Sequence, residues 1–155
     1  MKLLSIFALA AFLIPHCLSA QNKAEVFPGK DISSQWGDLT QKAKASGSSG
    51  NKLGDYQSHN IGLSLRTKSG VAEVHAHFDD VFFVTKGKAT LITGGTVIDG
   101  KTDSAGETRG TGISNGTSQE ITVGDVVHIP AGTPHQLMLP EGEVYAAIIV
   151  KVKEP

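Results

Sequence analysis

From residue 56 onward, the chain consists of short segments in which apolar and polar residues alternate, separated by glycine, aspartate and proline. Alternation at a period of two residues is typical of β-strands with one buried face. We predict eight strands, at 56–66, 71–77, 80–86, 89–97, 119–123, 125–129, 135–139 and 143–152. So many short strands with almost no helix favour an all-β closed barrel or a double-sheet jelly roll.

The first twenty residues have a different character. Lys2 precedes an apolar run at 3–14, and a proline and small residues ending at Ala20 follow. This pattern is typical of a secretory signal peptide covering 1–20, with an N-terminal anchor as the alternative. We therefore expect a secreted or periplasmic protein that does not associate with a membrane after signal removal.

Residues 21–55 are expected to form an N-terminal extension to the β-barrel domain at 56–155. Apolar residues recur at helical spacing within 33–45, which predicts a short helix packed on the outside of the domain. The glycine- and serine-rich segment 43–52 is predicted to be a flexible connection.

Composition excludes several classes of protein. The 14 basic and 15 acidic residues nearly balance, and 39% of residues are hydrophobic, which is typical of a soluble globular domain and not of a nucleic-acid-binding protein. The single cysteine, Cys17, lies in the predicted signal peptide, so the exported chain has no disulfide. Its stability must come from an apolar core, or from a core and a bound metal.

Two short segments contain candidate metal ligands. His75 and His77 are separated by one residue, so they share a face if the predicted strand includes both. Two exposed or hydrogen-bonded histidines are the simpler interpretation, because a metal site needs further ligands. His135 is a candidate third ligand, and it directly follows the conformationally restricted turn 130–134.

The second of these segments resembles a motif of the cupin family, which runs Gly, five residues, Pro, one residue, Gly, two residues, His, three residues, Asn. Gly124, Pro130, Gly132 and His135 match this spacing, and Leu139 replaces the final Asn.

The first segment resembles the other cupin motif, which runs Gly, five residues, His-x-His, three or four residues, Glu, six residues, Gly. Here Gly70 lies one residue too close to His75, and only two residues separate His77 from Asp80, which replaces Glu. Asp80 is preferred to Asp79 because Gly87 follows it after six residues.

This resemblance implies a cupin-type jelly-roll barrel that binds one divalent transition metal, Fe, Mn, Ni, Cu or Zn. The implied ligands are His75, His77, Asp80 and His135. The resemblance also implies a homodimer, for which the apolar segment 144–152 is expected to supply an exposed sheet edge.

Three other features are candidates for the same site. His128 is either a catalytic base in the cavity or a surface residue. Arg66 is a candidate anion-binding residue if its strand face turns inward, and is otherwise solvated. The segment 92–117 contains seven glycines and is either a lid or cavity rim, with Glu107 and Arg109 as its polar contacts, or a solvated hairpin extension.

Two classes of function remain open. The first is a secreted metal-dependent enzyme acting on a small molecule, either an oxidoreductase of the dioxygenase type or an isomerase. The alternative is a non-catalytic cupin that binds a small ligand or a metal. The fold does not decide between them, because one fold supports many functions.

Overall fold

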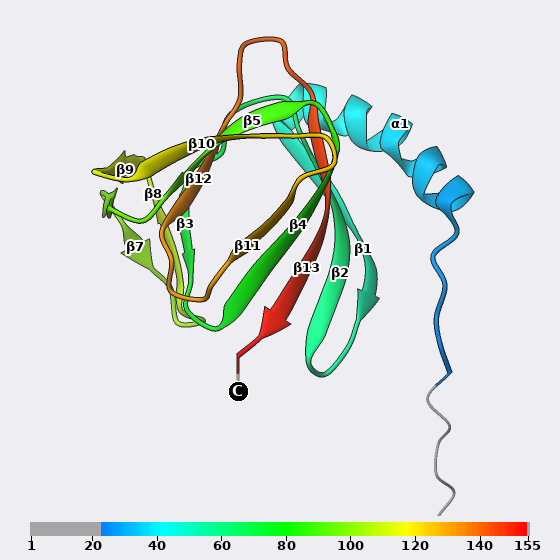
Figure 1. Ribbon diagram of the computed structural model, residues 1–155, viewed down its shortest axis with the longest axis horizontal. Coiled ribbons are helices and arrows are strands. Elements are labelled where there is room, and N and C mark those ends of the chain that lie inside the picture. Colours follow the sequence, from blue (N-terminus) through cyan, green and yellow to red (C-terminus); the bar gives the residue numbers. More distant parts are fainter. Residues whose placement is uncertain (1–22, 155) are drawn as a thin grey trace, which may run out of the picture.

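The computed structural model describes residues 23–154, so the predicted signal peptide lies outside the described residues. Two β-sheets, one of five strands and one of six, face each other. One helix covers the outer surface of the five-stranded sheet (Figure 1). This arrangement confirms the all-β jelly-roll prediction, although the two sheets pack together and do not close into one continuous barrel. Within 23–154, no helix has the length and apolar character needed to cross a membrane.

The elements are as follows. The five-stranded sheet has the order β1 (Ser48–Asp55), β2 (His59–Arg66), β13 (Tyr145–Lys153), β4 (Phe78–Lys86) and β11 (Val126–Ile129). The six-stranded sheet has the order β10 (Thr117–Thr122), β5 (Lys88–Thr93), β12 (His135–Met138), β3 (Ala72–His75), β8 (Glu107–Gly110) and β7 (Lys101–Thr102). β6 (Thr96–Ile98) pairs with β9 (Gly112–Ser114), and every pairing is antiparallel.

The main core lies between the two sheets, where the inward-facing residues of several strands meet. On β13, Tyr145 and Ala147 are buried in this core, and Lys151 continues the same face. On β4, Phe82 is buried in the core and Asp80 precedes it on the same face. The inward faces of these strands are thus apolar in the core and polar at one end of the space between the sheets.

The helix α1 (Gly29–Ser46) packs on the outer face of the five-stranded sheet. Leu39 and Ala43 of the helix form a second buried cluster with Leu63 and Leu65 of β2. The helix ends where Gly47 adopts φ +88° and donates its N–H to the Ala43 carbonyl, a conformation that glycine adopts without strain.

Three sequence-based expectations about these elements are wrong. The segment predicted to be flexible instead completes α1 and forms β1, whose residues pair with β2 through backbone hydrogen bonds that need no apolar side chains. The segment 144–152 is not an edge, because β13 lies between β2 and β4. The homodimer is therefore still a prediction, without the edge that was expected to form it.

The third correction concerns the glycine-rich segment. It is not an irregular lid but a set of short strands, and β8 adds to the six-stranded sheet by pairing with β3. The hairpin-extension alternative therefore describes its backbone, while Glu107 and Arg109 of β8 line a cavity between the sheets, as the cavity-rim alternative predicted. β3 itself ends at His75, and His77 lies in the following turn, so the two histidines do not share a strand face.

Candidate metal centre

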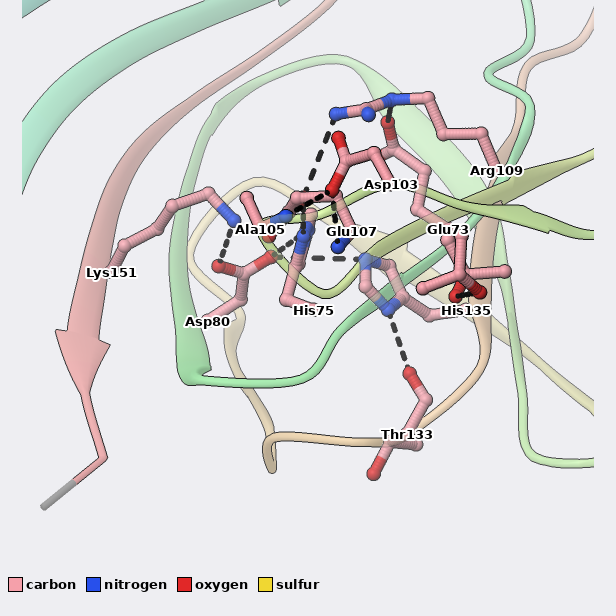
Figure 2. Close-up of polar contacts among 12 residues, drawn as sticks. Glu73, His75, Asp80, Asp103, Ala105, Glu107, Arg109, Thr133, His135 and Lys151 are labelled. Atoms are coloured by element: carbon pink, nitrogen blue, oxygen red, sulfur yellow. Dashed lines mark hydrogen bonds and ion pairs between the residues drawn. The ribbon is translucent and has the colours of Figure 1, made fainter.

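A cavity of about 230 Å³ opens between the two sheets at the polar end of the core. Strands from both sheets contribute to its wall, and the side chains gathered there are mostly ionisable (Figure 2). The charged and imidazole side chains that line it are Arg66, Glu73, His75, Asp80, Glu107, Arg109, His135 and Lys151.

His75, the last residue of β3, is buried, and both of its ring nitrogens have acidic neighbours. Nδ1 lies 2.5 Å from Oε2 of Glu107, which is its direct partner across the β3–β8 pairing. Nε2 points the other way and lies 3.3 Å from Oδ2 of Asp80. Because a carboxylate can only accept, Nδ1 donates its proton to Glu107, which leaves Nε2 free to bind a cation when the ring is neutral.

His135, the first residue of β12, is held in the same way. Its Nδ1 donates to the Thr133 carbonyl at 3.0 Å, and its Nε2 lies 3.7 Å from Oδ2 of Asp80. The turn before it is tied to β3, because the N–H of Gly132 donates to the His75 carbonyl at 2.8 Å. The two imidazole rings are 5.1 Å apart between centroids, so both free nitrogens face one small volume.

Asp80 is only 3% exposed, and it is ionised by its surroundings. Burial raises the pKa of Asp80, but the hydrogen bond from His75 and the charge and hydrogen bond of Lys151 outweigh burial and hold that pKa below its usual value. Lys151 Nζ lies 2.7 Å from Oδ1, directly across from Asp80 in the β13–β4 register. Oδ2 is the oxygen that remains directed at the histidines.

The two histidines respond to burial differently. Burial lowers the pKa of His75, but Asp80 and Glu107 together outweigh burial and the repulsion from Lys151, so the pKa lies above 6.5. Burial also lowers the pKa of His135, and there the Thr133 carbonyl and Asp80 do not compensate, so the pKa lies below 6.5. His135 is therefore the more readily available nitrogen ligand near neutral pH.

Glu73 completes the group from the same face of β3 as His75. Glu73, His75 and His135 each offer one ligand atom, and these atoms lie within 4.8 Å of one another. Two imidazole nitrogens with carboxylate oxygens are a donor set that suits Fe, Mn, Ni, Cu or Zn. The residues present therefore fit a divalent transition metal, with Asp80 beside them as a further oxygen donor.

His77 and His128 lie elsewhere. His77 is exposed in the turn after β3, beside Gly106, and does not line the cavity. His128 has a 58% exposed side chain, and its Nε2 lies 3.2 Å from Oδ2 of Asp79. The other oxygen of Asp79 accepts the N–H of Ala131 at 2.7 Å, so Asp79 holds the turn before His135 and does not face the cavity.

Sequence reasoning missed Glu73, although a signal for it was present. If Glu73 and His75 take the two positions of the His-x-His motif, four residues separate His75 from Asp80, which is the spacing that the cupin motif asks for. Lys151 had no such signal, because it is one of two lysines near the end of the chain. Only the pairing of β13 with β4 brings it to Asp80.

Comparison with solved structures identifies the class of fold. A double-stranded β-helix protein from Klebsiella pneumoniae has a TM-score of 0.51 and 16% identity, covering 68% of this chain and 76% of its own. The Schizosaccharomyces pombe Cnp3 cupin domain has a TM-score of 0.52 and 12% identity, covering 69% and 65%. The polyketide cyclase RemF from Streptomyces resistomycificus has a TM-score of 0.50 and 17% identity, covering 70% and 68%.

The chain therefore has the cupin fold, also called the double-stranded β-helix, as its sequence motifs predicted. At these identities the likeness concerns the fold and not the activity. No family model matches the sequence. No curated protein matches it either.

Proposed function

We propose that this protein binds one divalent transition metal through Glu73, His75 and His135, with Asp80 as a fourth donor, and acts on a small molecule in the adjoining cavity. One observation carries the proposal. Each imidazole donates its Nδ1 proton to an outer acceptor, Glu107 or Thr133, and turns its Nε2 toward the same carboxylate oxygen. Hydrogen bonds of this kind orient histidines as metal ligands.

The surrounding residues favour acid–base chemistry of the isomerase type over oxygenase chemistry. A bound divalent metal would polarise a substrate oxygen as a Lewis acid. Lys151 Nζ lies 2.7 Å from Asp80 at the wall of the same cavity, where it is positioned as the acid–base group for a bound molecule. Phe82, Leu137 and Ile149 line the apolar side of the cavity.

The second candidate is a cupin that binds a small ligand without a metal and without turnover. The Lys151–Asp80 contact favours it, because an ammonium group at 2.7 Å already balances the most buried carboxylate of the site. In this case the two histidines would bind the ligand directly through hydrogen bonds.

Metal analysis of single variants distinguishes the candidates. The wild-type protein should bind about one equivalent of Mn, Fe, Ni, Cu or Zn, and His75→Ala, His135→Ala and Glu73→Ala should each lose most of it, because a small site with one donor fewer loses both affinity and geometry. His77→Ala is the matched control and should keep wild-type metal content. Asp79→Ala should lose less metal than His135→Ala, because Asp79 holds the turn before His135 and does not face the cavity.

Two results would overturn the metal proposal. One is a wild-type protein that binds none of these ions after reconstitution. The other is equal loss of metal in His77→Ala and His135→Ala, since His77 is exposed and does not line the cavity.

We also propose that the protein acts outside the cytoplasm, on the strength of the signal-peptide pattern in residues 1–20. N-terminal sequencing of exported protein should give a start near Gln21. An exported chain that still begins at Met1 would contradict signal-peptide cleavage, and a chain retained in the cytoplasm would contradict the proposal.

A further inference from the structure

Arg66, the last residue of β2, is the one cation of the cavity wall that has no acidic partner among residues 23–154. Arg109 lies 3.5 Å from both Glu73 and Glu107, and Lys151 is paired with Asp80. The guanidinium of Arg66 forms neither an ion pair nor a hydrogen bond with the described part of the chain. Its charge is therefore available to a ligand.

The packing of β2 explains why this side chain faces the cavity. Leu63 and Leu65 are buried beneath α1 on the outer face of the sheet, so Ser64 and Arg66, which alternate with them, face inward. Arg66 is half-buried and lines the cavity, which favours the anion-binding interpretation over the solvated one.

Gly70 leaves space for the guanidinium. A Cβ atom at Gly70 would lie 3.0 Å from Nη1 and 3.3 Å from Cζ of Arg66. The Gly70 backbone is itself held in place, since its carbonyl accepts from Gln136 Nε2 at 2.9 Å and its N–H donates to the Leu137 carbonyl at 2.8 Å. The guanidinium thus rests against a peptide that cannot easily move.

Arg66 also lies at the boundary between two cavities. A second, more polar cavity of about 320 Å³ adjoins the first, and Arg66, Gly70, Val71 and Glu73 line both. A ligand bound at Arg66 is therefore reachable from solvent through the second cavity. On its other side it lies in the same cavity as Glu73, His75 and His135.

We propose that Arg66 binds the carboxylate of a small organic acid, which extends from there toward the candidate metal centre. The planar guanidinium offers two parallel N–H groups that match a carboxylate. Within the first cavity, Arg66 is the one unpaired cation beside three acidic side chains, which suits a group of one negative charge better than a phosphate dianion. The inference rests on the proposed function in naming the substrate class for that cavity, but it stands on contacts that involve no metal.

The test measures binding of propionate, lactate, pyruvate and benzoate by NMR titration, with propionamide and lactamide as neutral isosteres and inorganic phosphate as the competing anion. It uses the full exported protein, both as purified and after metal removal. At least one of the four carboxylates should bind wild type measurably, and more tightly than its amide or than phosphate. Arg66→Gln should weaken that binding by about tenfold to a hundredfold, as expected for a lost hydrogen-bonded charge.

Three further variants locate the effect. Arg66→Lys keeps the positive charge but loses the two parallel N–H groups of the guanidinium, and should lose most of the carboxylate affinity. Gly70→Ala keeps Arg66 but displaces its guanidinium, and should weaken binding by several-fold without unfolding the protein, because only a flexible side chain must move. Lys88→Gln removes an exposed charge that is paired with Glu120, and should bind as wild type does.

Separate readouts keep the two proposals apart. Metal content should stay at the wild-type level in both Arg66 variants, whereas His135→Ala should lose metal and keep the carboxylate preference of the metal-free protein. Equal binding of carboxylates and amides, tighter binding of phosphate, or unchanged carboxylate affinity in Arg66→Gln would each overturn the role of Arg66. Loss of metal binding alone would leave that role intact.

Discussion

The carboxylate of Glu107 accepts a hydrogen bond from Nδ1 of His75, with 2.5 Å between the two atoms. Glu107 belongs to β8, in the glycine-rich segment between the two sequence motifs, and β8 pairs with the strand that carries His75. The segment therefore contributes to the candidate centre by orienting a ligand, and its removal would affect more than access to the cavity.

Replacing Glu107 should weaken metal binding without unfolding the protein. Glu107→Gln keeps an acceptor for Nδ1 but removes the negative charge that makes the imidazole a stronger base, so the metal Kd should rise by about tenfold to a hundredfold. Competition titration with a chelating dye measures this. Glu120→Gln, on the exposed surface of β10, is the control. A Kd that is equal in both variants would show that Glu107 has no positioning role.

Metal affinity should depend on pH in a way that follows the two histidines. As the pH is lowered, His75 takes up a proton first, because its pKa lies above 6.5, and this proton competes with the metal for Nε2. His135 has a lowered pKa and takes up its proton only at lower pH. As the pH is lowered from 8, the metal affinity should begin to fall above pH 6.5 and should then drop about tenfold per pH unit. Metal titrations between pH 5 and pH 8 test this, together with NMR titration of the imidazole signals. A metal Kd that does not change until well below pH 6.5 would contradict it.

Tyr145 should destabilise the protein at alkaline pH. Its hydroxyl is buried without a hydrogen-bond partner among residues 23–154, and burial raises the pKa of Tyr145 to about 12. Because the folded-state pKa exceeds the unfolded value of 10.0, the stabilisation is complete below pH 10 and is lost as pH rises toward 12, by up to about 3 kcal/mol in the free energy of unfolding.

The Tyr145→Phe variant isolates this contribution. It removes an unpaired buried hydroxyl, so its free energy of unfolding at pH 8 should equal or exceed that of wild type. Urea denaturation at pH 8 and pH 11 should show a smaller alkaline loss in the variant. An equal loss in both proteins would mean that other groups cause the alkaline instability.

The outer face of the five-stranded sheet is the surface on which we expect a homodimer to form. Phe83 and Val126 are paired across β4 and β11 and are 42% and 62% exposed, beyond the area that α1 covers. Phe83→Glu should therefore shift the protein to monomer in light scattering at micromolar concentration. Val123→Glu, an equally exposed position in the turn after β10, should not. A wild-type protein that is already monomeric would refute the prediction.

Much of the fold and three of the four proposed donors, His75, Asp80 and His135, could be predicted from local patterns. Period-two alternation predicts strands because successive side chains of a strand point to opposite faces, and it predicted most of the sheet strands near their observed positions. The spacing of glycine and proline before His135 marks a restricted turn, and the six residues before Gly87 favoured Asp80 over Asp79. Both Asp80 and His135 do point into the cavity.

The tertiary structure decided which neighbour of His75 shares its face. Sequence spacing allows His77 as readily as Glu73, since both lie two residues away. The strand ends at His75 because the next residues turn toward Gly106, so only Glu73 remains on the inward face. Where a strand ends depends on the pairing of its neighbours, which the local pattern does not contain.

Long-range pairing also supplied the remaining groups of the site. Glu107, Lys151 and Arg66 come from strands distant in sequence. Sequence reasoning named Glu107 and Arg66 as candidates with a solvated charge as the alternative, and no local pattern marked Lys151. Glu107 reaches His75 through β8, and Lys151 reaches Asp80 through β13. Arg66 faces inward because α1 covers the leucines on the opposite face of β2. By itself, the sequence determined which residues alternate along each strand and where the chain turns. Whether the polar face of a strand points into the cavity depended on where its apolar face was buried by another element.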